Sequence, residues 1–242
     1  MTKDAALQGR VATAPRWMYR WAVSDLGFLS RLDQPARDAL EAGGRHRHFG
    51  TGQVLFSEGD DGRDVYILVE GMVKVVTTSA SGRQVILDLM TAGSVLGELS
   101  AIDGQPRSAS AEAVTPIDVL VLGIDDFRGF LQRQPRAAAA LLEVVAARLR
   151  MSSQRQLEFG ASDALTRLCR CILVMIDRFG DRGIDHSVDL PVVQQDLAKL
   201  TGLSREAVVK GLRRLRELGW VEASGRSIVV RDLPAVQARA RS

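Results

Sequence analysis

A carboxylate, a guanidinium, hydroxyls and a glycine that permits close approach occur within a short stretch, residues 97–109. They fall in two segments, Gly97-Glu98-Leu99-Ser100 and, after six residues, Arg107-Ser108-Ala109. A carboxylate accepts hydrogen bonds from sugar hydroxyls, whereas an arginine fork and nearby backbone N–H groups suit a phosphate. The stretch therefore indicates a pocket for a sugar phosphate. The alternative is a surface turn that carries one Glu–Arg ion pair.

The elements that must position this stretch are β-strands, because short β-rich runs separated by glycine-containing turns fill residues 48–122. The runs are 54–56, 65–69, 73–76, 85–89 and 119–122. Several short strands with this punctuation predict an antiparallel barrel or sandwich. Before them, residues 30–40 carry an amphipathic pattern that predicts a helix, with Asp33 as its N-cap ahead of Pro35.

A helical pattern follows over residues 136–159, with an unbroken seam of alternating three- and four-residue spacing. The seam consists of Leu142, Val145, Leu149, Ser152, Gln156 and Phe159. This spacing is typical of a coiled coil and predicts a parallel homodimer, whereas an ordinary core-facing helix is the alternative. The seam turns polar at Ser152, beside Ser153. Residues 160–163 break the helix as a short hinge, and Asp163 can cap the next helix, 164–179.

The C-terminal third contains two further helical segments, 194–200 and 205–217, joined by a turn with glycine. Ser204 is placed to cap the second segment. Two β-rich runs, 219–223 and 227–230, then flank a Ser-Gly-Arg turn and read as a wing. The order predicts a winged helix-turn-helix, although two helices and a basic face can also occur without DNA binding.

The first residues of the second helix in such a module point into the DNA major groove. Arg205 can donate a fork to guanine O6 and N7, and Glu206 can accept from cytosine N4. Lys210, one turn further, can donate to a base or a phosphate. The remaining DNA-binding candidates are Ser204, at the start of this helix, and three residues that are predicted to contact the backbone: Gln194, Gln195 and Arg214.

Composition and charge suit two domains or one large one, since 46% of the 242 residues are apolar. Residues 161–242 hold 14 Lys and Arg against 10 Asp and Glu, a net charge of +4, whereas the chain as a whole carries +3. The positive excess in the C-terminal third fits a nucleic-acid partner.

Other classes of site have little support in the sequence. Cys169 and Cys171 are too few for a metal cluster and are expected to be buried, inert thiols. No nucleophile–base–acid set accompanies the serines near Glu98, so no catalytic residue and no metal site is assigned and the chain is not expected to be an enzyme. No run of 18 apolar residues occurs, so neither a membrane span nor a membrane partner is expected, and the protein is expected in the cytoplasm.

The motif around Glu98 and Arg107 resembles the phosphate-binding cassette of cyclic-nucleotide-binding domains, specifically the cAMP receptor protein branch of the CRP/FNR regulators. Ser204-Arg205-Glu206 resembles the start of that family's recognition helix. Two positions depart from the pattern: Lys210, where the family's cAMP receptor has arginine, and Val193, where it has threonine. The resemblance spans residues 25–233.

The resemblance implies an α+β fold with an N-terminal cyclic-nucleotide-binding β-roll, a long dimerisation helix and a C-terminal winged helix-turn-helix. The implied division is an N-terminal extension, 1–24, a β-roll domain, 25–135, a dimerisation helix, 136–160, and a DNA-binding domain, 161–242. The implied partners are a cyclic nucleotide, double-stranded DNA, a second copy of the chain and RNA polymerase.

By this resemblance, Glu98 binds the ribose 2′-OH, while Arg107 and Ser108 bind the cyclic phosphate with help from backbone groups at Gly97, Leu99 and Ala109. Ser152 of one subunit and Ser153 of its partner cap the base. The expected function is a cAMP-activated, homodimeric transcription regulator that binds a pseudo-palindromic operator. The alternatives are the same architecture responding to cGMP or another effector, one active without effector, and a nucleotide-processing enzyme.

Overall fold

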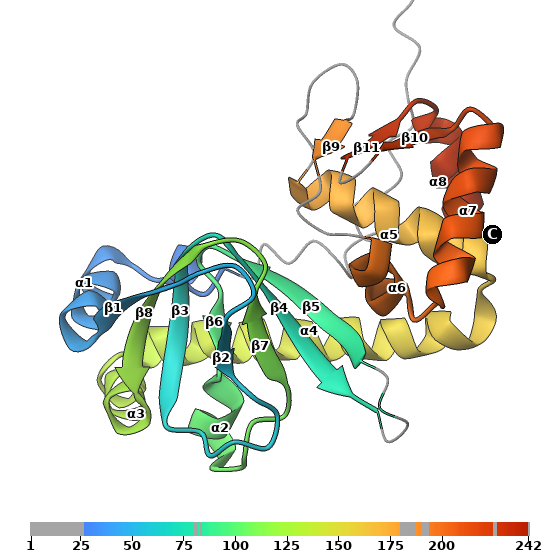
Figure 1. The fold of residues 1–242 in the computed structure, drawn as a ribbon. Helices are drawn as coiled ribbons and strands as arrows, with labels where there is room; N and C mark the ends of the chain where they lie inside the picture. The colour runs from blue at the N-terminus through green and yellow to red at the C-terminus, as the bar shows by residue number, and fades with distance from the viewer. Residues whose placement is uncertain are drawn as a thin grey trace, which may run out of the picture.

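The computed structural model describes residues 27–79, 82, 84–179, 187–189, 194–224 and 227–241. The predicted extension 1–24 lies outside these residues, as does the tip of the predicted wing at 225–226. Within the described residues, the chain forms a β-rich lobe, a long helix and a second, mostly helical lobe (Figure 1).

The β-rich lobe consists of two antiparallel four-stranded sheets among the described residues, which confirms the antiparallel barrel or sandwich that the β-rich runs predicted. The strand orders are β1-β8-β3-β6 and β2-β7-β4-β5. The strands are β1 Arg45–Phe49, β2 Val54–Phe56, β3 Asp64–Glu70, β4 Met72–Thr78, β5 Gln84–Thr91, β6 Val95–Leu96, β7 Ser110–Ala113 and β8 Ile117–Gly123. Apolar side chains of both sheets, including Leu68, Val73, Ala111 and Val119, form one buried cluster between them.

Two of the turns require glycine. Gly71 joins β3 to β4 at φ +86°, and a Cβ there would lie 2.3 Å from the Pro116 carbonyl oxygen. Gly97 sits at φ +77° directly before α2, Glu98–Asp103, and directly after β6. Only glycine adopts this conformation without strain, so the chain can turn sharply from strand into helix at the position of the candidate site.

Helices cover one face of the roll with a second apolar cluster. They are a 3-10 turn, Leu29–Arg31, α1 Gln34–Gly43, α3 Ile124–Arg133 and the start of α4, Pro135–Ala161. The predicted helix 30–40 was wrong in its start: Leu32 is extended, and α1 begins after Asp33. The carboxylate of Asp33 accepts from the Ala36 N–H at 3.0 Å, which confirms it as the N-cap.

The long helix α4 runs beneath the roll and on to the second lobe (Figure 1). Two of its predicted seam residues are exposed large apolar side chains: Leu142 is 66% exposed and Leu149 67%. The side chains of Gln156 and Phe159 lie outside the described residues. Such an apolar row on one helix face is what a helix–helix interface requires.

The second lobe has the predicted order of elements. They are α5 Ala164–Phe179, β9 Ser187–Asp189, α6 Gln194–Thr201, α7 Arg205–Glu217, β10 Val221–Ser224, β11 Ser227–Val230 and α8 Leu233–Arg241. Asp163 accepts from the Thr166 N–H at 2.8 Å and Ser204 accepts from the Ala207 N–H at 3.1 Å, so both predicted caps are confirmed. β9, which adds a third strand to the wing, and α8 were not predicted.

The helix-turn-helix lobe packs directly on the β-roll through α6. Buried apolar residues of β4 and β5, among them Met72 and Ile86, belong to the same cluster as Leu197 of α6. Polar contacts border this interface between α6 and the β-roll: Lys199 Nζ donates to Gln84 Oε1 at 2.7 Å, and Lys74 Nζ lies 3.9 Å from Asp196 Oδ1. The two lobes are therefore joined by more than the helix between them.

Candidate functional site

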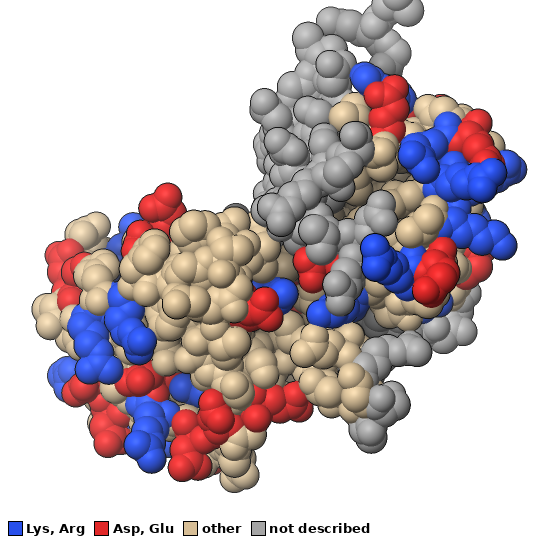
Figure 2. Space-filling view, viewed as in Figure 1, with Lys and Arg blue, Asp and Glu red and all other residues tan. Residues whose placement is uncertain are grey.

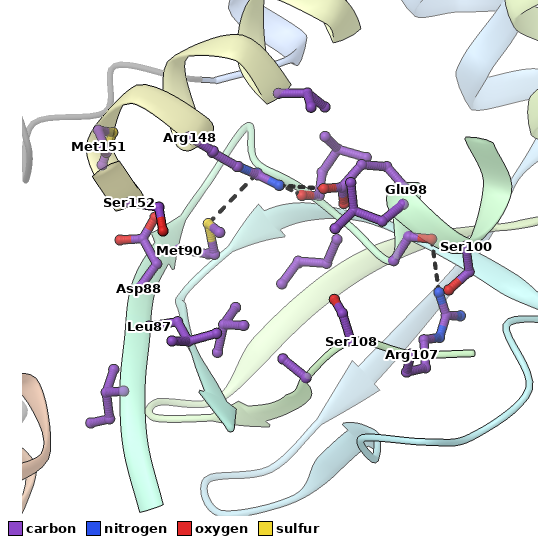
Figure 3. A pocket seen from close by; sticks show the side chains of 18 of the residues that line it. Leu87, Asp88, Met90, Glu98, Ser100, Arg107, Ser108, Arg148, Met151 and Ser152 are labelled. Carbon is purple, nitrogen blue, oxygen red and sulfur yellow. Dashed lines mark hydrogen bonds and ion pairs between the residues drawn. The ribbon is translucent and has the colours of Figure 1, made fainter. Parts of the chain in front are cut away.

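A cavity of about 560 Å³ opens between the β2-β7-β4-β5 sheet, α2 and the middle of α4. Its lining includes all seven residues that the sequence motif singled out, together with Ser152 of α4. They are Gly97, Glu98, Leu99, Ser100, Arg107, Ser108 and Ala109. Two segments separated by six residues thus meet around one hollow, in which Glu98 and Arg107 project from different elements (Figure 3).

Arg107 is 5% exposed and is held by backbone groups on several sides. Its Nη1 donates to the Gly97 carbonyl at 2.8 Å and its Nη2 to the Asp64 carbonyl at 2.5 Å. Its Nε is buried without a partner among the described residues. Burial lowers the pKa of Arg107, while the charge or dipole of Tyr66, Asp64, Glu98 and Asp60 opposes that change. The site therefore holds a cation whose surroundings include carbonyl dipoles and room for an anion.

Glu98 is 3% exposed and forms its ion pair with a residue far away in the sequence. Arg148 Nη1 of α4 lies 2.6 Å from Glu98 Oε1, and Arg148 Nη2 donates to the Val95 carbonyl at 2.8 Å (Figure 3). The alternative of a surface turn with a Glu–Arg pair is wrong, because Glu98, Ser100 and Arg107 are all buried. Arg148 also fixes α4 over the cavity.

The far end of the cavity is formed by α4 and β5. Ser152 of α4 and Asp88 of β5 both line it (Figure 3), and Asp88, 7% exposed, accepts from the Leu89 N–H at 2.8 Å. Ser153 is not part of the lining in this single chain; its hydroxyl donates to the Leu149 carbonyl at 3.1 Å. Its predicted contact is with a nucleotide held by the other subunit.

Among the lining residues that sequence reasoning missed are Phe56, Asp88, Arg148 and Leu200. Phe56 and Asp88 lie in predicted strands. The periodicity of a strand indicates which face of the sheet a side chain occupies, but not that this face lines a cavity. Arg148 has a detectable signal, since it is a cation among apolar seam residues on the predicted long helix. Leu200 belongs to α6, and no local pattern connects it to a strand more than a hundred residues earlier.

The predicted DNA-binding residues gather at the start and along one side of α7. Arg205, Glu206, Lys210 and Arg214 are all exposed, and Figure 2 shows Lys and Arg side chains clustered over this lobe. A hydrogen bond from its own backbone N–H, and then one from Ser204, lowers the pKa of Glu206. Arg214 Nη1 lies 3.6 Å from Glu217 Oε2.

Two further candidates begin the preceding helix. Gln194 and Gln195 open α6, and their side chains lie outside the described residues.

Other site types find no support in the part of the chain that the structure describes. No group of three or more His, Cys, Asp or Glu side chains there could hold a metal ion. Cys169 and Cys171 are buried thiols, and burial raises the pKa of Cys169 to about 11. No described helix is both long and apolar enough to cross a membrane.

The fold and the two sites define a class: a ligand-binding β-roll joined by a long helix to a winged helix-turn-helix. The family model "Cyclic nucleotide-binding domain" matches residues 46–134, and "Crp-like helix-turn-helix domain" matches residues 166–239. The protein is thus a DNA-binding transcription regulator with a cyclic-nucleotide-binding domain.

Known proteins and solved structures resemble nearly the whole chain. The "CRP-like cAMP-activated global transcriptional regulator" of Mycobacterium tuberculosis H37Rv is 31% identical over 216 residues, which cover 89% of this chain and 96% of that protein. The "Cyclic AMP receptor protein" of Thermus thermophilus is 30% identical over 188 residues, 78% of this chain and 84% of that protein. The structure of the regulator CLP from Xanthomonas campestris superposes with a TM-score of 0.74 at 20% identity, covering 82% of this chain and 99% of that one. The chain belongs to the CRP/FNR family.

Proposed function

We propose that this protein is a homodimeric regulator whose DNA binding is increased by cAMP. Arg107 and Ser108 bind the cyclic phosphate, together with backbone N–H groups at Gly97, Leu99 and Ala109. Glu98 accepts from the ribose 2′-OH, and Ser100, which lines the same cavity, also contacts the nucleotide. One observation carries the proposal: a buried arginine and a buried carboxylate line one preformed cavity, where the arginine Nε has no partner among the residues that the structure describes. The cAMP-activated relative from Mycobacterium tuberculosis and the cyclic AMP receptor protein of Thermus thermophilus favour the adenine nucleotide.

The base of the nucleotide would reach Ser152 and, across the dimer seam, Ser153 of the second copy. Hydroxyls both donate and accept, so they can meet adenine or guanine. The Asp88 carboxylate, which lines the same cavity as Ser152, keeps cGMP as the second candidate, because guanine presents two neighbouring donors, N1–H and N2–H, to a carboxylate. A protein of this architecture with another effector, or with none, is a further alternative.

The ligand would act as a population shift between arrangements of the two recognition helices. In the dimer, residues 136–160 form the seam, 25–135 hold the nucleotide and 161–242 bind DNA, with 1–24 as an extension. Two-fold symmetry then requires a pseudo-palindromic operator with half-sites about one helical turn apart, ~34 Å.

At the operator, Arg205 and Glu206 would read base edges, with Lys210 reaching a base or a phosphate. Ser204, Gln194, Gln195 and Arg214 would contact the backbone. We place the protein in the cytoplasm, acting with RNA polymerase and without catalysis of its own.

Calorimetry with cAMP and cGMP on the purified protein tests the effector. Arg107→Ala and Glu98→Ala should each weaken binding at least about tenfold, because a charge-assisted hydrogen bond contributes about 1.5–3 kcal/mol. Arg136→Ala is the matched control, since the Arg136 side chain is 93% exposed. Unchanged affinity in both pocket variants would refute the assignment, and consumption of cAMP by the pure protein would select the enzyme alternative.

A DNA titration tests the assignment of α7 as the recognition helix. Arg205→Ala should cost ~1–3 kcal/mol at the cognate site and relax preference at one base pair. Arg214→Ala should instead weaken all sequences similarly. If Arg205→Ala leaves selectivity intact, α7 does not read bases through this residue.

A further inference from the structure

Phe56 is an aromatic residue in the ligand cavity that the proposed function leaves without a task. It is the last residue of β2, it is half-buried, and it lines the cavity together with Arg107. The Arg107 Cζ atom lies 4.4 Å from the centre of the Phe56 ring, within the range of a cation–π contact. The ring therefore covers one face of the guanidinium.

The rest of the guanidinium is fixed at its edge rather than on its face. Nη1 donates to the carbonyl of Gly97, which directly follows β6, and Nη2 donates to the carbonyl of Asp64, the first residue of β3. A Cβ on Gly97 would lie 2.3 Å from Nη1, so this close approach depends on glycine. Two in-plane hydrogen bonds set the edge, but a contact on the face is needed to stop the group tilting out of that plane.

The backbone of Arg107 is tied to the turn that follows Phe56. The Arg107 N–H donates to the Asp60 carbonyl at 2.9 Å, and the Gly59 N–H donates to the Arg107 carbonyl at 2.9 Å. The turn that follows Phe56 is thus joined to Arg107 by two backbone hydrogen bonds, in addition to the contact between the Phe56 and Arg107 side chains.

The Phe56 ring packs against a second aromatic residue, Tyr66. Its centre lies 5.7 Å from that of Tyr66, which is 5% exposed and whose hydroxyl donates to the Leu55 carbonyl at 3.4 Å. Strand pairing places Phe56 opposite Ala111, a residue too small to compete for the same space. The ring is therefore a rigid platform rather than a loose lid.

We propose that Phe56 is a positioning residue, whose ring holds the Arg107 guanidinium in the plane from which it meets an anionic phosphate ester. This inference rests on the proposed function and names how its phosphate contact is built. An aromatic face suits the task because it attracts the cation without consuming an N–H donor, whereas a carboxylate would neutralise the charge and compete with the phosphate. The simpler alternative is that Phe56 only fills the core between the sheets.

A double-mutant cycle on cAMP affinity separates these two roles. Phe56→Leu removes the ring and keeps an apolar side chain; it should weaken cAMP binding about 2- to 30-fold, the range of a cation–π contact. Phe56→Tyr retains the ring and should stay within about twofold of wild type. In an Arg107→Gln background, Phe56→Leu should have no further effect, because the guanidinium that the ring holds is gone.

Each result of the cycle has one meaning. Equal weakening by Phe56→Leu in both backgrounds, or no weakening in the wild-type background, overturns the positioning role and leaves Phe56 as core. Failure of the wild type to bind either cAMP or cGMP instead refutes the proposed function itself. If Phe56→Leu does not fold, as judged by its unfolding transition, Phe56→Met provides the same cycle.

Discussion

The Glu98–Arg148 pair gives the most direct test of how α4 is held on the ligand cavity. Both partners are largely withdrawn from water: the side chains of Glu98 and Arg148 are 5% and 20% exposed, and the closest N–O distance is 2.6 Å. Removing one partner of a buried pair leaves an uncompensated charge and costs about 3–5 kcal/mol. Because Arg148 keeps some contact with water, Arg148→Met should lie near the lower limit, about 3 kcal/mol. Methionine retains the packing of the aliphatic stem.

The assay is urea unfolding at neutral pH without nucleotide, at one fixed protein concentration because dimerisation contributes to stability. Glu98→Gln alone should cost less than Arg148→Met, since the amide oxygen still accepts from Arg148. In the double variant no charge is stranded, so its loss should be smaller than the sum of the single losses by about 1–3 kcal/mol. Arg136→Met, on the exposed part of α4, should change stability by less than about 0.5 kcal/mol. Additive single and double losses would refute the reasoning.

Three further predictions concern the second lobe. Asp163→Ala removes the N-cap of α5 and should lower the unfolding free energy by about 1 kcal/mol at pH 7 in urea titrations. Because the Thr166 N–H, and then Arg239, hold the pKa of Asp163 below its ordinary 3.8, that difference should persist above pH 4 and shrink as the pH falls through the folded-state pKa; a constant difference down to pH 2 would contradict this. Cys169, with its pKa raised to about 11, should react with a thiol reagent at pH 8 only after unfolding, so rapid labelling of the native protein would show that the thiol is not buried. Leu200→Ala should reduce the nucleotide-dependent gain in DNA affinity by about 0.5–2 kcal/mol, because Leu200 joins the cavity wall to α6; an unchanged gain in a DNA titration would exclude this contact from the coupling.

Local signals in the sequence were sufficient for the longer helices and for three helix caps, although they misplaced the start of α1 and missed β9 and α8. Asp33, Asp163 and Ser204 were recognised as caps because the capping bond links residues three positions apart. Strands β2, β3, β4, β5 and β8 followed from β-rich runs and glycine turns, and the cavity motif from residue types within one short stretch, whereas β1, β6 and β7 had no such run. These features depend on interactions that close within a few residues.

The features that were missed depend on distant contacts. Arg148 reaches Glu98 across 50 residues, and Leu200 reaches the cavity only because α6 packs on β5. Local patterning cannot specify which buried carboxylate an arginine on a helix will meet, since the pairing is set by how the helix crosses the sheet. The same holds for Phe56, whose strand face was predictable but whose contact with Arg107 was not.

The coupling between the cavity and α7 is the central claim, and a titration of operator DNA with and without cAMP tests it most directly. The expected result for the wild-type dimer is a gain in DNA affinity of about 1–3 kcal/mol when cAMP is present, 5- to 150-fold. The variant with both Ser152→Ala and Ser153→Ala should still bind cAMP but lose most of that gain. A wild-type protein that binds cAMP yet shows the same DNA affinity with and without it would contradict the account.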